Sequence, residues 1–128
     1  TQCSADSPEA VITQIGGRDI AAMYGAMGRA AELGIATIVD GFIASAAALA
    51  LITAYGDAAP FLIWGHRSAE SGHRHILESA NSDGLLDLGL RLGEASGALT
   101  AFPLLEAACA IHCEMATFTD AHVPNRDP

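Results

Sequence analysis

The stretch Leu88–Ala98, which reads Leu-Gly-Leu-Arg-Leu-Gly-Glu-Ala-Ser-Gly-Ala, decides the predicted fold of this chain. The apolar run 85–90 predicts a strand, the turn after it carries the carboxylate of Glu94, and small residues then open a long helix. In open α/β proteins, ligands bind where the carboxyl end of a strand is followed by the N-terminus of a helix. The stretch therefore predicts an α/β fold with Glu94 at the edge of its sheet.

Two earlier segments repeat this step from strand to helix. The apolar runs 35–39 and 61–64 each end in a short polar turn that precedes a helical pattern. The three predicted strand centres are spaced by roughly 25 residues, which is typical of parallel strands joined by right-handed helical crossovers. We therefore expect a three-layer α/β arrangement of repeated βα units, with about three parallel strands, resembling part of a doubly wound Rossmann-like domain.

The tips of these strands carry the candidate functional residues. Asp40 follows the first strand and Ser68 follows the second, so parallel strands would place them with Glu94 around one crevice. Each also has a structural interpretation. Asp40 and Ser68 would cap the helices that follow them, and Glu94 would be a solvated residue at a helix start.

Five helices are predicted from hydrophobic periodicity and capping residues. They span 9–15, 18–33, 42–55, 68–79 and 96–121, and Pro103 is expected to kink or divide the last one. The helix at 42–55 is apolar nearly all round and should lie sandwiched. We divide the chain into a lead-in (1–15), an α/β portion (16–123) and a tail (124–128).

The composition excludes several classes of partner. The chain has fifteen acidic residues and six basic residues, all arginine, for a net charge of -9. Such a charge disfavours nucleic acid and anionic membranes. The uncharged run of sixteen residues between Asp40 and Asp57 is shorter than the ~20 residues of a membrane span. The three cysteines show no secreted framework and no signal peptide is seen, so we expect a cytoplasmic location.

Two clusters raise the possibility of a metal site. His73 and His75 are two residues apart, a spacing that points them in different directions on a helix. Cys109, His112 and Cys113 share a helix with no fourth ligand at a familiar spacing, and buried free cysteines are common in apolar helices. We therefore expect no metal site.

Five segments, in order along nearly the whole chain, carry a family resemblance. They are Gly-Gly-Arg-Asp-Ile-Ala at 16–21, Val-Asp-Gly-Phe-Ile at 39–43, His-Arg-Ser-Ala-Glu-Ser-Gly-His at 66–73, Leu-Asp-Leu-Gly-Leu-Arg-Leu-Gly-Glu-Ala-Ser-Gly-Ala at 86–98 and Glu-Met-Ala-Thr-Phe at 114–118. Together they resemble the C-terminal portion of the nicotinate-nucleotide–dimethylbenzimidazole phosphoribosyltransferase family. The resemblance implies a doubly wound α/β fold, usually in a homodimer, with no metal or cofactor required.

The resemblance also implies a reaction, in which phosphoribose moves from nicotinate mononucleotide to 5,6-dimethylbenzimidazole. The products are α-ribazole 5′-phosphate, used in cobalamin lower-ligand synthesis, and nicotinate. By the family motif Glu94 is the general base, and its pKa would be best raised by apolar walls such as Leu90 and Leu92.

The roles of Ser68, Arg91, Leu92 and Gly93 also follow from the resemblance, whereas those of Asp40 and His66 are inferred from the residues themselves. Ser68 is expected to contact the nucleotide phosphate, and Asp40 to hold ribose hydroxyls or a water molecule. The substrate is expected to be lined by Arg91, Leu92, Gly93 and His66, although Arg91 would alternatively serve a structural ion pair.

This chain departs from the family pattern in three respects. The first is that Gly-Gly-Arg-Asp at 16–19 stands where the family more usually has Gly-Gly-x-Glu. The family's earlier half supplies a Gly-Glu-x-Gly-Ile-Gly-Asn segment and a lysine near the phosphate, and this sequence contains neither. Ala95 stands where the family usually has glycine. We therefore expect the enzyme to need a companion N-terminal portion. The alternative is a catalytically incomplete binding or interaction domain of the same origin.

Overall fold

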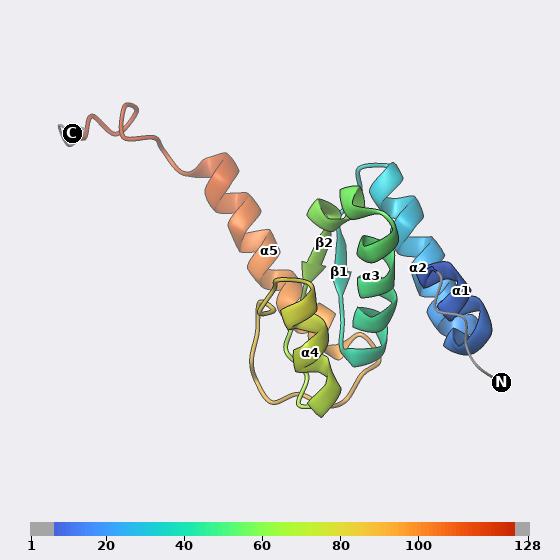
Figure 1. Ribbon diagram of the computed structural model, residues 1–128. Coiled ribbons are helices and arrows are strands. Elements are labelled where there is room, and N and C mark those ends of the chain that lie inside the picture. The colour runs from blue at the N-terminus through green and yellow to red at the C-terminus, as the bar shows by residue number, and fades with distance from the viewer. Residues whose placement is uncertain (1–6, 125–128) are drawn as a thin grey trace.

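A small parallel sheet lies at the centre of the computed structural model, which describes residues 7–124 (Figure 1). Strands β1 (Thr37–Val39) and β2 (Leu62–Trp64) pair in parallel, with Thr37 opposite Leu62 and Val39 opposite Trp64. Both strands lie within the apolar runs that predicted them. The α/β class and the parallel pairing are therefore confirmed.

The predicted third strand at 85–90 is wrong as a regular strand. Beyond β1 and β2, the described residues contain only an isolated parallel bridge, between His66 and Leu86. Gly84 and Gly89 have φ angles of 77° and 65°. These left-handed conformations turn the chain away from the extended path of a strand. The segment therefore lies beside the end of β2 and then coils towards the last helix.

The helices follow the predicted order, with altered boundaries. They are α1 (Pro8–Val11), the π-helical turn η1 (Ile12–Gly16), α2 (Gly17–Glu32), α3 (Phe42–Ala54), the 3₁₀ turn η2 (Gly56–Phe61), α4 (Ser71–Ser79) and α5 (Ser96–Glu114). From Pro8 onward, the predicted lead-in is helical, and α1 packs against α3. Residues 1–6 of the lead-in and 125–128 of the tail lie outside the described residues.

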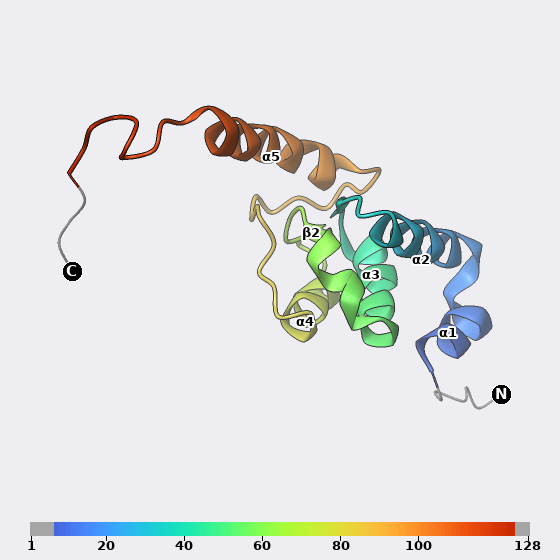
Figure 2. The same cartoon turned by 90° about the horizontal axis from the view of Figure 1, so that it is seen from above.

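The core forms on one face of the sheet. Ala47, Ala48 and Leu51 of α3 are at most 2% exposed, and they pack with apolar residues of α2, α4 and both strands. α3 and α4 lie on the side of the sheet opposite α5, which gives three layers (Figure 2). α3 lies between α2 and α4, as its composition predicted, although Ile43 remains 51% exposed.

α5 leaves the sheet after its first turns. Its buried residues are Gly97 and Ala101, whereas Leu99 and Ile111 are more than half exposed. The helix ends at Glu114, not at Ala121 as predicted, and Pro103 lies inside it without dividing it. Cys109 and Cys113 are exposed, so the prediction that they are buried is wrong. Among the described helices, α5 alone has the length and apolar composition of a membrane-spanning helix. A core helix of a soluble protein can have the same length and composition.

Candidate active site

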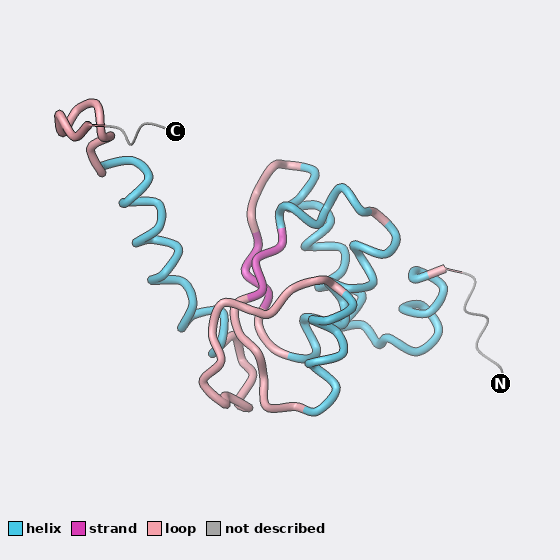
Figure 3. The backbone as a smooth tube through the Cα atoms, turned by 60° about the vertical axis from the view of Figure 1, so that its left-hand side comes forward, coloured by secondary structure: helices cyan, strands magenta, loops and turns pink. Residues whose placement is uncertain are grey.

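The carboxyl ends of β1 and β2 bring Asp40 and His66 together. The N–H of Gly65 donates to the carbonyl of Val39 at 2.9 Å, so the pairing with β1 continues one residue past the end of β2. His66 Nε2 lies 4.0 Å from Asp40 Oδ1. The longest loops gather at this end of the strands (Figure 3). The structure thus confirms that two of the predicted strand tips meet at one edge.

His66 is packed into the junction between the sheet and α5. Its side chain is 2% exposed, and its Nδ1 has no hydrogen-bond partner among the described residues. A Cβ on Gly97 would overlap the imidazole ring, and one on Gly41 would lie 3.3 Å from Nε2. Glycine at these two positions therefore lets the start of α5 and the turn after β1 close around the ring.

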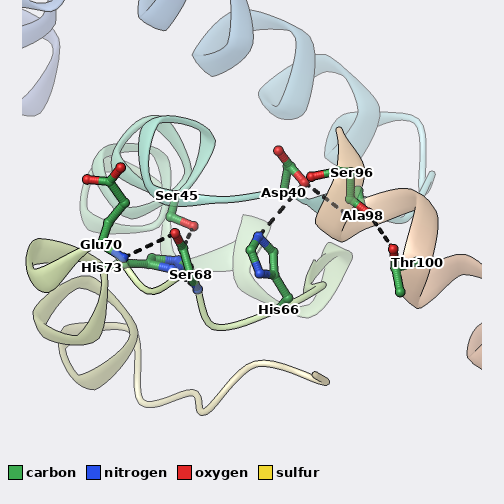
Figure 4. A network of polar contacts seen from close by, with 9 residues as sticks. All are labelled: Asp40, Ser45, His66, Ser68, Glu70, His73, Ser96, Ala98 and Thr100. Carbon is green, nitrogen blue, oxygen red and sulfur yellow. Dashed lines mark hydrogen bonds and ion pairs between the residues drawn. The ribbon is translucent and has the colours of Figure 1, made fainter. Parts of the chain in front are cut away.

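Asp40 caps α5, which is a contact that its position in the sequence did not suggest. Its Oδ1 accepts a hydrogen bond of 2.9 Å from the N–H of Ala98 (Figure 4). The prediction that Asp40 would cap the helix following it is wrong, because α3 has Gly41 as its N-cap and no side-chain cap. The carboxylate instead links the tip of β1 to a helix that begins more than fifty residues later.

Glu94 lies on a strained turn immediately before α5. Gly93, Glu94 and Ala95 have φ angles of 81°, 54° and 61°, three consecutive left-handed residues. For a residue with a side chain this conformation costs roughly 1–2 kcal/mol, and such strain tends to occur at functional sites. Glu94 is exposed and makes no hydrogen bond within residues 7–124. Leu92 is 76% exposed, so the predicted apolar wall on that side of Glu94 is wrong.

Ser68 and His73 form a buried polar cluster behind these tips. The N–H of Ser68 donates to His73 Nδ1 at 2.8 Å, and Ser45 Oγ lies 2.8 Å from Nε2 (Figure 4). Because Nδ1 accepts, Nε2 carries the proton and donates to Ser45. Burial lowers the pKa of His73, which keeps its ring neutral.

Ser68 does not begin the next helix, so its predicted N-cap role is wrong. α4 starts at Ser71 with Glu70 as its N-cap, while Ser68 Oγ accepts a bond of 3.3 Å from the N–H of Glu70. This short-range bond closes a turn ahead of the helix. The amide of Ser68 is already bound to His73. Its hydroxyl accepts from Glu70 and donates no hydrogen bond within residues 7–124, and the residue is 8% exposed.

The other predicted lining residues are exposed or partly exposed along the coil after Leu86. Arg91 Nε donates to Glu70 Oε1 at 3.2 Å, which is the structural ion pair considered from the sequence. The pair is largely exposed, so it contributes little to stability. Whether Arg91, Leu92 and Gly93 contact substrate stays a prediction.

The two histidines of α4 face different ways, as their spacing predicted. His73 is fully buried, whereas the side chain of His75 is 81% exposed and lies 3.5 Å from Glu78. No group of three or more potential metal ligands lies together within the described part of the chain.

A cavity on the described surface lies away from this cluster. It has a volume of about 730 Å³ and lies between α2, the end of α3 and η2, with Tyr24 and Tyr55 in its walls. None of the predicted site residues lines it. The buried polar groups at the strand tips and the strained turn before α5 therefore lie apart from this cavity, and they are the candidate site.

Comparison with known proteins identifies the family. A family model described as phosphoribosyltransferase matches residues 1–123. The nicotinate-nucleotide–dimethylbenzimidazole phosphoribosyltransferase of Bradyrhizobium diazoefficiens is 49% identical over 123 residues, or 96% of this chain. The chain belongs to the nicotinate-nucleotide–dimethylbenzimidazole phosphoribosyltransferase family. The corresponding enzyme of Pseudomonas fluorescens is 51% identical over 112 residues, 88% of this chain.

A solved member of the family shares the fold. The crystal structure of the enzyme from Thermus thermophilus superposes with a TM-score of 0.88 at 39% identity, covering 95% of this chain and 37% of that one. The chain covers 35% of the Bradyrhizobium enzyme and 32% of the Pseudomonas enzyme. It therefore spans about a third of the length of the phosphoribosyltransferases that it matches.

Sequence reasoning missed the role of His73, although the sequence contains a signal for it. His73, Ile76, Leu77 and Ala80 recur at helical spacing, which predicts one buried face, and a histidine on such a face needs partners. Ser45, a polar residue inside a largely apolar helix, has the same requirement. No local pattern marked the bond between Asp40 and Ala98.

Proposed function

We propose that this chain is the C-terminal portion of an enzyme that transfers phosphoribose from nicotinate mononucleotide to 5,6-dimethylbenzimidazole. The observation that carries the proposal is the placement of Glu94. It stands on a left-handed turn two residues before a helix whose first turn is bound to the tip of β1. The relatives that share this segment are named for that reaction.

The chemistry needs one base and no acid. The ring nitrogen of nicotinate is quaternary in the nucleotide, so the electron pair of the breaking C1′–N bond neutralises it and nicotinate leaves without a proton. One nitrogen of 5,6-dimethylbenzimidazole forms the new bond to C1′, and the proton on its other nitrogen passes to Glu94. A positioned base of this kind contributes about 100- to 10,000-fold to the rate.

The phosphate is proposed to bind near Ser68 and the start of α4. The Ser68 hydroxyl donates no hydrogen bond within residues 7–124, and α4 has no side-chain cap on its first N–H groups. Free N–H groups at a helix start favour an anion. The backbone of Arg91, Leu92 and Gly93, together with the buried His66, would complete the substrate site.

The remaining two-thirds of such an enzyme would have to come from a companion portion, and a homodimer would bring a second copy. Large apolar side chains along α5 are exposed, including Phe102 and Ile111, and we propose that these partners cover them. We propose that protein, and not a lipid bilayer, covers these side chains, because the family match includes all of α5. A cytoplasmic location is part of the same proposal.

A chimera tests the function. In it, this chain replaces the C-terminal third of the Bradyrhizobium relative, and formation of α-ribazole 5′-phosphate is followed by mass spectrometry. Glu94→Gln should lower kcat by about 100- to 10,000-fold. Glu106→Gln, an exposed glutamate on α5, is the matched control and should leave kcat unchanged. Turnover by Glu94→Gln equal to that of the unaltered chimera would remove Glu94 from the base role.

The alternative is a domain of this family that binds an aromatic base but turns nothing over. The missing glycine-rich segment and lysine favour it if no companion portion exists. If calorimetry showed that the chimera binds 5,6-dimethylbenzimidazole while it forms no product, the binding-domain hypothesis would be favoured over the enzyme.

A further inference from the structure

The side chain of Asp40 caps the start of α5, a role that the helix's own N-cap residue does not fill. The N-cap residue of α5 is Ala95, whose methyl side chain offers no acceptor. In most helices the N-cap side chain accepts from the N–H of the second or third residue. Here Asp40 Oδ1 accepts from the third residue, Ala98, at 2.9 Å. Its carboxylate also carries the charge that a helix dipole favours at this end.

Little else in the described residues fixes α5. Apart from Gly97 and Ala101 the helix has no buried residue, and among the elements it packs chiefly on β1. Its backbone lies directly on the sheet, since a Cβ added to Gly65 would be only 3.3 Å from the Cα of Ala98. Glu94 precedes this point by one helical turn. The position of Glu94 relative to the strands therefore depends on the contacts that fix the first turn of α5.

We propose that Asp40 is a positioning residue: its carboxylate fixes the first turn of α5 to the tip of β1 and so sets where the Glu94 carboxylate stands. This inference rests on the proposed function, because it concerns the base of that reaction. It assigns to Asp40 a role through α5 in place of the direct contact with ribose hydroxyls or a water molecule expected from the sequence. Oδ1 is already bound, and the side chain is only 16% exposed.

The first test uses amide hydrogen exchange on the chain itself. Asp40→Ala should speed exchange of the Ala98 amide by about 5- to 30-fold, because loss of a cap makes local opening easier. Asp40→Asn keeps an acceptor at the same place and should leave the rate close to that of the unaltered chain. The Ala47 amide, buried in α3, is the internal reference and should not change. Should Asp40→Ala fail to fold by circular dichroism, Asp40→Ser, which is too short to reach Ala98, replaces it.

The second test uses the chimera described above. Asp40→Ala should lower kcat by about 100-fold with KM for nicotinate mononucleotide little changed, since a misplaced base slows chemistry without weakening substrate binding. Asp40→Asn should restore most of the activity. A raised KM with unchanged kcat would indicate direct substrate contact and overturn the proposal. Unchanged Ala98 exchange in an active chimera overturns the role of Asp40 alone, whereas an inactive unaltered chimera refutes the proposed function and this role with it.

Discussion

Gly97 allows α5 to lie against His66, and replacing it with alanine should force the two apart. A Cβ at residue 97 would fall within the van der Waals radii of three ring atoms of His66. The ring has little room to turn, because it is 2% exposed and also abuts Gly41. Overpacking a buried site costs about 1–3 kcal/mol, and the better helix propensity of alanine returns about 0.5–1 kcal/mol. We expect the free energy of unfolding to fall by about 1–2 kcal/mol and Tm to fall by about 3–10 °C.

Urea denaturation followed by circular dichroism measures this loss. Gly25→Ala is the matched control, because Gly25 is also helical and a Cβ there would meet nothing within 4 Å. That variant should gain about 0.5–1 kcal/mol from propensity alone. NMR resonances of the His66 ring should shift in Gly97→Ala and stay fixed in the control. A Gly97→Ala chain as stable as the unaltered one, with its His66 resonances unmoved, would refute the packing described above.

Three further predictions concern stability and association. Ala95→Gly relieves a left-handed backbone with φ of 61° and should raise the free energy of unfolding by about 1 kcal/mol in urea melts; a decrease would contradict the strain. Burial lowers the pKa of His73 from 6.5, so below pH 6.5 the unfolded chain binds a proton that the folded chain refuses. Stability should therefore be full above about pH 6.5 and fall as the pH drops towards the lowered pKa. His73→Gln should flatten this slope in denaturation series, whereas the same slope in His73→Gln as in the exposed control His75→Gln would exclude His73 as its source. In light scattering the isolated chain should associate through its exposed apolar surface, and a clean monomer would count against that surface being an interface.

The parts of the fold that depend on neighbouring residues could be predicted from the sequence. The spacing of Ile20, Met23, Tyr24 and Met27 predicted a helix, and the structure has α2 at Gly17–Glu32. Two apolar, β-branched runs predicted the parallel strands β1 and β2. In these segments, local propensity and tertiary packing favour the same structure.

The predictions that failed depended on where distant segments meet. The run 85–90 reads as a strand, but the left-handed backbone of Gly84 and Gly89 is visible only in the structure. Ser68 resembles a helix cap, yet His73 takes its amide and the helix starts three residues later. The apolar composition of the last helix led us to expect buried cysteines. Cys109 and Cys113 are instead exposed, because no other element of residues 7–124 packs on that part of α5.

The site was predicted in part. Strand order was expected to gather Asp40, Ser68 and Glu94 around one crevice. The structure shows that the tips of the first two strands meet, where His66 lies 4.0 Å from Asp40. The hydrogen bond from the Ala98 N–H to the Asp40 carboxylate joins residues 58 positions apart, and a pair so distant cannot be predicted from hydrophobic periodicity. The catalytic role of Glu94 stays a prediction that only measured turnover decides.

The most direct test of this account is reconstitution from two parts. This chain is mixed with the separately purified N-terminal two-thirds of the Bradyrhizobium relative, and α-ribazole 5′-phosphate is measured after nicotinate mononucleotide and 5,6-dimethylbenzimidazole are added. The account predicts product from the mixture and almost none from either part alone. Substantial product from this chain by itself, or none from the mixture and the fused chimera alike, would contradict it.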